Sequence, residues 1–180
     1  MEKEKEEHVI ILEYLPNGYP LERKMMPIAQ AIGEKNLTLL ELVPRRGISL
    51  ELGEKVYIGE GKRDKIYYIL GRLPREKLTE TAKTQLEDFI KKVVKEQAQR
   101  FIGFFNNSDA INKRMHQIEL LPGFGKKHMK EIITKRKEKD FESFEDMKSR
   151  IQNLPDPGKA VEKRIIQELT NMERYNLFVR

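Results

Sequence analysis

An ungapped internal repeat constrains the fold of this 180-residue chain more than any other feature. The segment IELLPGFGKKHMKEII, residues 118–133, aligns with IQNLPDPGKAVEKRII, residues 151–166, and 8 of the 16 positions are identical. Apolar residues also precede the two copies at matching positions, as Ile111 and Phe144 do. The pattern predicts two copies of helix, short hairpin and helix that bury their apolar faces in a compact four-helix unit.

The first hairpin, LPGFGKK, contains more glycine and more positive charge than a simple joint between helices needs. Glycine at Gly123 and Gly125 permits positive φ and close approach of another backbone. Gly125 is expected to begin the second helix, whose first backbone N–H groups have no partner within the helix and favour a phosphate oxygen. Lys126 and Lys127 add attraction for a polyanion, and Lys130 lies one turn further along. Such contacts position a nucleic acid without reading its bases.

The second hairpin differs from the first at the positions that matter for phosphate. Asp156 and Pro157 replace Gly123 and Phe124. Gly158 and Lys159 match the glycine and the first lysine that follow in the first hairpin. An acid repels phosphate, and a proline removes an N–H donor. These differences favour a structural role for the second hairpin, although Lys159 stays among the candidate nucleic-acid-binding residues.

The two hairpins serve as controls for each other. Gly125 and Gly158 occur in both copies and are therefore predicted to be what the fold needs. Gly123 and Lys127 are the additional residues of the first copy, and phosphate binding explains them best. Phe124 has two interpretations, a wedge inserted between bases or an apolar residue that packs locally, and it is kept in the candidate set.

The distribution of charge also singles out the first hairpin. The net charge is +6, but residues 1–74 have 12 basic and 12 acidic side chains, whereas Lys113–Lys139 has 9 basic and 3 acidic ones. Adaptation to heat enriches mixed charge everywhere, while a local excess favours an anionic partner. Within this segment, the run KRKEK at 135–139 either complements a helix C-terminus or follows a phosphate backbone.

The repeat and its hairpin resemble the tandem helix–hairpin–helix domain of many DNA repair, recombination and replication proteins, over residues 107–172. In that family an apolar residue precedes Gly-x-Gly and a helix with a basic first turn, a pattern matched by Leu121, Gly123, Gly125, Lys126 and Lys127. The resemblance implies binding of phosphates through backbone amides. The departure in the second hairpin argues against symmetrical binding of a duplex.

Residues 8–74 have the pattern of a small curled sheet or barrel. Predicted strands with glycine-containing turns are HVIILEYLP, LTLLELVPR, LELGEKVYIGEG and DKIYYILGRL, and MMPIAQAIGEKN is predicted to form a short helix. Basic residues fall at the predicted loops and are candidates for an additional binding face on the barrel, although acidic neighbours balance them: Arg45, Arg46, Lys62, Arg63 and Lys65.

Residues 75–106 have the apolar spacing of one long connecting helix, with Thr79 or Thr81 as a cap near its start. Its aromatic residues are expected in the core rather than in a stacking surface. NNSD then ends the helix, and Ser108 or Asp109 is predicted to cap the next one. Residues 1–7 and 173–180 are predicted tails. The fold class expected is α+β: an OB-like barrel, a connecting helix and an all-α tandem helix–hairpin–helix domain.

Several classes of protein are excluded by composition. The absence of cysteine excludes disulfides and thiolate metal sites, and the three histidines lack ligand spacing, so neither a metal nor another cofactor is expected. The chain has no apolar run of membrane-spanning length, and its charged N-terminus is unlike a signal peptide, which favours the cytoplasm. There is neither a P-loop nor a nucleophile-elbow motif, and no assembled catalytic site, so no enzymatic activity is predicted.

The whole chain resembles an uncharacterised archaeal family of predicted RNA-binding proteins that combine an OB-like barrel with a helix–hairpin–helix region. The features that match are ILEYLPNGYP, PIAQAIGEKNLTLLELVPR, LELGEKVYIGEG and LPGFGKK. The resemblance favours RNA over DNA, a choice that the residues alone leave open. The main hypothesis is a non-catalytic nucleic-acid-binding protein. The alternatives are an adaptor whose paired hairpins and barrel dock on a protein partner, and a nuclease with an unrecognised site.

Overall fold

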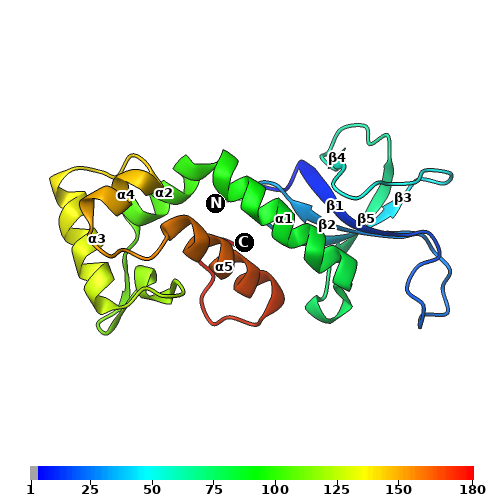
Figure 1. The fold of residues 1–180 in the computed structure, drawn as a ribbon. Helices are drawn as coiled ribbons and strands as arrows, with labels where there is room; N and C mark the ends of the chain where they lie inside the picture. The colour runs from blue at the N-terminus through cyan, green and yellow to red at the C-terminus, as the bar shows by residue number, and fades with distance from the viewer. Residues whose placement is uncertain (1–3) are drawn as a thin grey trace. The chain divides into compact units, whose positions relative to one another are not determined.

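A computed structural model describes residues 4–180, so the first three residues of the predicted N-terminal tail lie outside the described part. The chain forms two compact units (Figure 1). One unit contains the residues up to Phe89 together with Glu168–Arg180, and the other is Ile90–Gln167. The mixed α and β content agrees with the predicted class.

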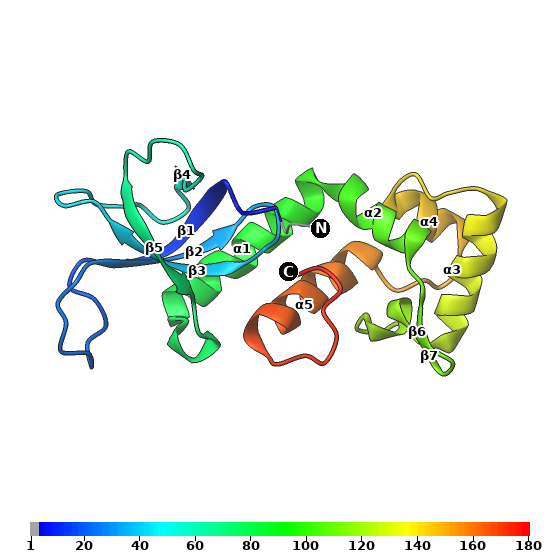
Figure 2. The same cartoon turned by 180° about the vertical axis from the view of Figure 1, so that it is seen from behind.

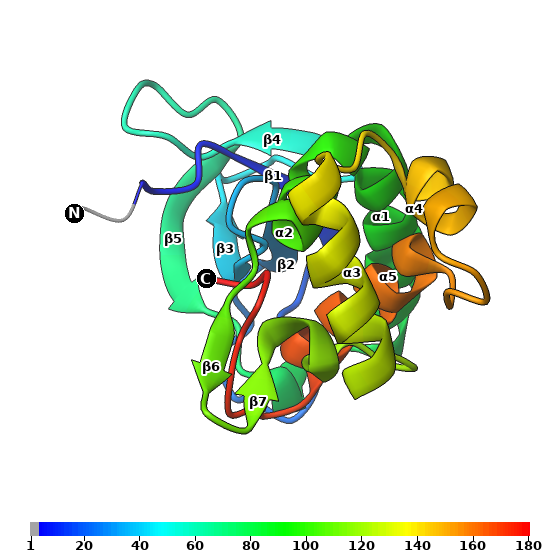
Figure 3. The same ribbon diagram turned by 90° about the vertical axis from the view of Figure 1, so that its left-hand side faces the viewer.

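The first unit is built on a curled, five-stranded antiparallel sheet with strand order β4-β1-β2-β3-β5. Irregularities in register interrupt the β1–β2 and β3–β5 pairings, and such bulges increase local twist. Figure 3 shows β4 and β5 curving round the central strands. The strands are β1 (His8–Leu15), β2 (Ile28–Gly33), β3 (Leu39–Pro44), β4 (Lys55–Tyr57) and β5 (Ile66–Arg72).

The predicted short helix around residues 25–36 was wrong. This segment contains β2, a central strand with all six residues buried and with β1 and β3 paired on either side. Its two alanines fit a helix by propensity, but pairing on both edges and burial on both faces outweigh that preference. The sheet therefore has five strands where the sequence predicted four.

The sheet closes over an aliphatic core. Apolar side chains that alternate along the strands meet there, as period-two patterning requires. The fully buried members include Val9, Ile11, Ala29, Ala31, Leu42 and Ile66. The loops contribute Leu50 and Ile58.

The predicted long helix is present but is interrupted once. A 3-10 turn η1 (Arg75–Lys77) leads into α1 (Glu80–Glu96), and Gln97 separates α1 from α2 (Ala98–Asn107). The Thr79 hydroxyl accepts a hydrogen bond from the Ala82 N–H at 3.1 Å, which confirms it as a cap. The apolar stripe is in the core as predicted, including the buried rings of Phe101 and Phe105.

The second unit is not all-α, and the four-helix prediction was wrong. A helix was expected before the first hairpin, but a two-stranded sheet, β6 (Ala110–Asn112) and β7 (Met115–His116), occupies that position. A four-residue 3-10 turn, η2 (Gln117–Leu120), follows it and leads towards α3 (Lys126–Glu138), as Figure 2 shows. The second copy has α4 (Phe144–Arg150) and α5 (Pro157–Thr170).

Ser108 ends a helix instead of beginning one. Its backbone N–H donates to the Phe104 carbonyl at 2.8 Å, so it is the C-terminal cap of α2. Asp109 is followed by β6, not by a helix. The prediction failed because serine and aspartate end and begin many kinds of turn as well as capping helices.

The C-terminal residues are held within the first unit by hydrogen bonds. One oxygen of the buried Glu168 carboxylate accepts hydrogen bonds from the N–H groups of Leu177, Phe178 and Val179. The Arg180 N–H donates to the Asn36 carbonyl at 3.0 Å. Among the described residues, no helix combines the length and the apolar composition needed to cross a bilayer.

Candidate nucleic-acid interface

The two glycines of the first hairpin have different conformations. Gly123 has φ +83°, a backbone conformation that disfavours side chains, whereas Gly125 has φ −115° and ψ −171°, which any residue adopts. A Cβ at Gly125 would meet no atom within 4 Å. The assignment made from the repeat is therefore reversed, because the turn requires Gly123, whereas neither the backbone angles of Gly125 nor its described neighbours require a glycine.

Gly125 is the N-cap of α3, and it has no side chain with which to cap the helix. Its own N–H donates to His128 Nδ1 at 3.1 Å. Within the described residues, the N–H groups of Lys126 and Lys127 have no hydrogen-bond acceptor. Together with the positive end of the helix dipole, they form a surface suited to an anionic oxygen.

The first turn of α3 carries positive charge where helices prefer negative charge. Lys126 and Lys127 occupy its first two positions, Lys130 follows, and all three are exposed. The first turn contains no acidic residue. Each lysine beside the positive helix end is unfavourable by a few tenths of a kcal/mol, roughly, which an anion bound there would offset.

Phe124 lies in the core of the second unit. Its side chain is only 6% exposed. Its ring centroid is 6.1 Å from that of Phe105 and 5.7 Å from that of His128. Local packing is therefore the correct one of the two interpretations, and the side chain is not available as a wedge between bases.

The second hairpin is closed by its own side chains. The Asp156 carboxylate accepts a hydrogen bond from the Lys159 N–H at 3.1 Å, which caps α5. Pro157 begins that helix and offers no N–H. Gly158 is buried, and a Cβ there would lie 3.4 Å from the Phe144 ring. Lys159 and Lys163, which match Lys126 and Lys130, have exposed cationic side chains.

Much of the KRKEK run makes contacts within the second unit. Arg136 donates to the Phe105 carbonyl at 3.0 Å and to the Ser108 hydroxyl at 3.1 Å. Lys139 pairs with Glu142 at 2.8 Å. These contacts join the C-terminal end of α3 to α2 and to the following connector, so this end of the helix has a structural role.

His116 is a site residue that the sequence did not single out. Its Nδ1 accepts a hydrogen bond from the Ile118 N–H at 3.1 Å, while Glu119 accepts from the His116 N–H at 2.8 Å. This reciprocal cap orders the η2 turn ahead of the first hairpin. Burial, followed by the positive charge of Arg136, lowers the pKa of His116 below its usual value of 6.5. Histidine rarely caps helices, so its residue type carried little signal for this role.

The basic residues of the first unit are largely held in place. Arg45 Nε donates to the Arg63 carbonyl at 2.7 Å, and Arg63 Nε donates to the Gly59 carbonyl at 2.8 Å. Lys65 pairs with Glu54. Arg46 and Lys62 are exposed.

A family model described as a protein of unknown function (DUF655) matches residues 5–180. The chain belongs to the DUF655 family. An uncharacterized protein from Methanocaldococcus jannaschii, MJ0038, is 43% identical over 177 residues, which cover 97% of this chain and 80% of that protein. The crystal structure of Af1531 from Archaeoglobus fulgidus, also described as DUF655, matches with a TM-score of 0.83 and 42% identity, and covers 97% of this chain and all of that one.

The family match and these relatives confirm the expectation of an uncharacterised family with archaeal members. The similarity to Af1531 extends over both units and so supports the fold described above. RNA binding, the OB-like barrel and the tandem helix–hairpin–helix domain stay predictions from resemblance.

Proposed function

We propose that this DUF655 protein is a non-catalytic nucleic-acid-binding protein that holds a phosphate backbone at the N-terminus of α3. The observation that carries the proposal is the uncapped Gly125, followed at once by two exposed lysines. Both features are unfavourable for an isolated helix, since a capping side chain and an acidic first turn would stabilise it. A bound phosphate reverses both disadvantages, because it accepts from the amides and neutralises the lysines.

Contacts of this kind recognise the sugar–phosphate chain and not the bases, so we propose binding without sequence preference. The repeat supports assignment of the second unit as a divergent tandem helix–hairpin–helix domain, and the curled sheet supports an OB-like first unit. RNA is favoured over DNA on family resemblance. The closed second hairpin implies that phosphate contacts concentrate at the first.

Binding can be tested by fluorescence anisotropy with labelled RNA and DNA, single-stranded and duplex, over a range of salt concentrations. Lys126→Glu/Lys127→Glu should weaken binding at least tenfold at low salt, because it removes two cations and adds two repulsive charges. A matched control is Lys92→Glu/Lys95→Glu, which makes the same change in net charge at two exposed positions of α1. Absence of binding at low salt, or equal loss in both double variants, would refute the proposal.

A protein-interaction adaptor is the second candidate function. The loop between β1 and β2 exposes Leu21 almost completely and Met25 to 78%. This loop is therefore where an adaptor would offer apolar contacts, since contiguous exposed apolar surface marks interaction sites. An adaptor would capture a protein partner in a manner sensitive to Leu21→Ser/Met25→Ser and insensitive to the charge variants of α3.

A further inference from the structure

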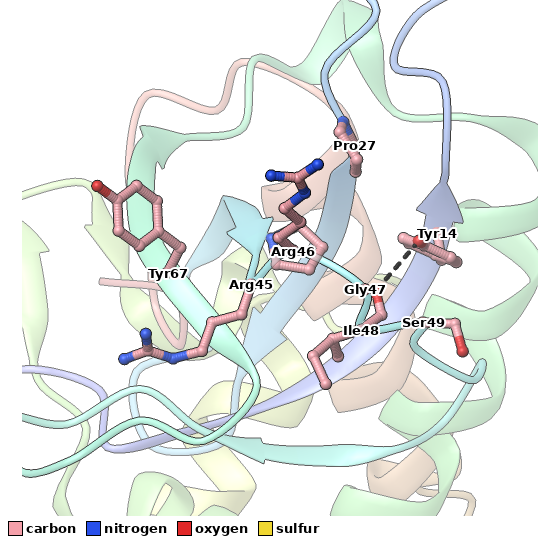
Figure 4. A pocket seen from close by; sticks show the side chains of 9 residues that line it. Tyr14, Pro27, Arg45, Arg46, Gly47, Ile48, Ser49 and Tyr67 are labelled. Atoms are coloured by element: carbon pink, nitrogen blue, oxygen red, sulfur yellow. Dashed lines mark hydrogen bonds between the residues drawn. The ribbon is translucent and has the colours of Figure 1, made fainter.

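A hollow in the first unit combines aromatic, apolar and cationic walls, and the proposed function at α3 makes no use of it. Its volume is about 560 Å³, which is within the range typical of small-molecule sites. None of its lining residues is acidic. They come from β1, the residue before β2, the end of β3 with the β3–β4 loop, and β5, and Figure 4 draws them: Tyr14, Pro27, Pro44, Arg45, Arg46, Gly47, Ile48, Ser49 and Tyr67.

A tight turn places the two arginines at this cavity. The Ile48 N–H donates to the Arg45 carbonyl at 3.0 Å, and Gly47 has φ +78°, as the third residue of a type II turn requires. Arg46 is therefore at the corner of the turn and projects outwards (Figure 4). It is exposed and has no hydrogen-bond or ion-pair partner among residues 4–180.

The turn is anchored on both sides, so the guanidinium of Arg46 is presented from a defined backbone. The Arg45 N–H donates to the Lys65 carbonyl at 2.8 Å, and the Arg45 side chain donates to the Arg63 carbonyl. On the opposite side, the Tyr14 hydroxyl donates to the Ile48 carbonyl at 3.3 Å. A rigid frame lowers the entropic cost of binding a ligand.

Tyr67 supplies an aromatic face at the rim of the cavity. It projects from β5 with 64% of its side chain exposed, although an aromatic ring gains from burial. Exposed aromatic side chains beside arginines are the components by which proteins bind unpaired bases, through stacking on the ring and attraction of the phosphate to the guanidinium. An acidic peptide would satisfy Arg46 but leave the Tyr67 face without a partner.

We propose that this cavity binds one unpaired nucleotide, with its base against Tyr67 and the apolar wall of Pro27 and Ile48, and its phosphate at Arg46. This inference deepens the proposed function and rests on it, because nucleic-acid binding at α3 is what makes the ligand a polymer. The bound nucleic acid must then contain a single-stranded segment. A base inside a duplex is stacked on both faces, so it cannot enter unless it is flipped out.

The experiment measures binding of the full-length protein to uridine and adenosine monophosphates by NMR, and to a labelled short oligouridylate and a matched RNA duplex by anisotropy. Tyr67→Ala should weaken binding of the oligouridylate about fivefold or more, the range for loss of one stacking contact. Tyr67→Phe should retain wild-type binding, because it keeps the ring. Arg46→Ala should weaken monophosphate binding, with Arg46→Lys intermediate. Thermal unfolding verifies that each variant is folded.

The outcomes separate this inference from the proposed function. Selective loss of single-stranded and monophosphate binding in Tyr67→Ala, with duplex binding unchanged, supports a nucleotide site even if the lysine variants of α3 behave like wild type. Equal affinity of Tyr67→Ala and wild type for every probe overturns it, as does equal loss for duplex and single strand. The inference is also overturned if the wild-type protein binds neither of the monophosphates nor the oligouridylate at low salt. Inorganic phosphate as competitor tests whether the base contributes.

Discussion

The carboxylate of Asp156 accepts a hydrogen bond from the backbone N–H of Lys159 at 3.1 Å and thereby caps α5. The residue that precedes α3 in the same way, its N-cap, is Gly125, which has no side chain. The two helices of the repeat thus begin differently, because a carboxylate caps α5 and no side chain caps α3. Backbone N–H donors that an external anion could reach are therefore left at the start of α3.

Converting Gly125 to aspartate should close the first hairpin as Asp156 closes the second. We expect Gly125→Asp to raise the free energy of unfolding by a few tenths of a kcal/mol, roughly, because aspartate caps better than glycine and favours the positive helix end. Nucleic-acid affinity should fall at the same time, since the carboxylate occupies the phosphate position. Urea unfolding and anisotropy measure the two effects. Gly125→Asn caps without charge and should give the smaller loss of affinity; unchanged affinity in both variants would contradict the prediction.

Removing the charges of Lys126 and Lys127 should stabilise the protein while weakening binding. Lys126→Gln/Lys127→Gln relieves repulsion with the helix dipole, with an expected gain of a few tenths of a kcal/mol, roughly, per lysine at low ionic strength. The slope of log K against log salt should become shallower by roughly 1.4–1.8, since two phosphate contacts no longer release counter-ions. Titrations at four or more salt concentrations measure it. A slope identical to that of the wild type would show that neither lysine contacts phosphate.

Gly123 should prove necessary for stability. Its φ of +83° is strained for any residue with a Cβ, so Gly123→Ala is expected to cost about 1–2 kcal/mol of stability. The space beside it is open, with only the Pro155 Cβ at 3.8 Å from an added methyl group, so the cost arises from the backbone and not from a clash. Equilibrium unfolding in urea gives the value. A loss as small as that of Gly125→Ala would contradict this distinction between the two glycines.

The misassignment of these two glycines shows where sequence reasoning reached its limit. The repeat correctly located the joints, and apolar spacing correctly identified Phe101 and Phe105 as core. However, aligned residues need not begin their helices in register: α3 begins at Lys126, whereas α5 begins at Pro157, two positions earlier in the alignment. The backbone angle at each glycine follows from that offset, which residue identities do not contain.

Errors elsewhere have a related cause, since they occur where tertiary contacts decide local structure. The β2 segment has alanines and a preceding Pro27 that suit a helix start, yet strands on both sides determine its conformation. The turn before the first hairpin depends on a histidine cap, and the cavity at Tyr67 depends on residues brought together from four parts of the chain. The sequence did mark Arg45 and Arg46, although not the ring beside them.

The stability of the first hairpin should depend on pH through His116. Burial and the nearby Arg136 lower the pKa of His116 in the folded protein, whereas in the unfolded chain it stays near 6.5. Below that value the unfolded state binds the proton more readily, so the contribution of His116 to stability is full above about pH 6.5 and declines as pH falls towards the folded pKa. The neutral ring is also the form whose Nδ1 accepts from the Ile118 N–H.

His116→Asn keeps a capping oxygen without a titrating group. Urea unfolding at pH 5, 6, 7 and 8 should therefore show wild type losing stability relative to His116→Asn as the pH is lowered; a difference that stays constant with pH, or grows in favour of wild type in acid, would contradict this account.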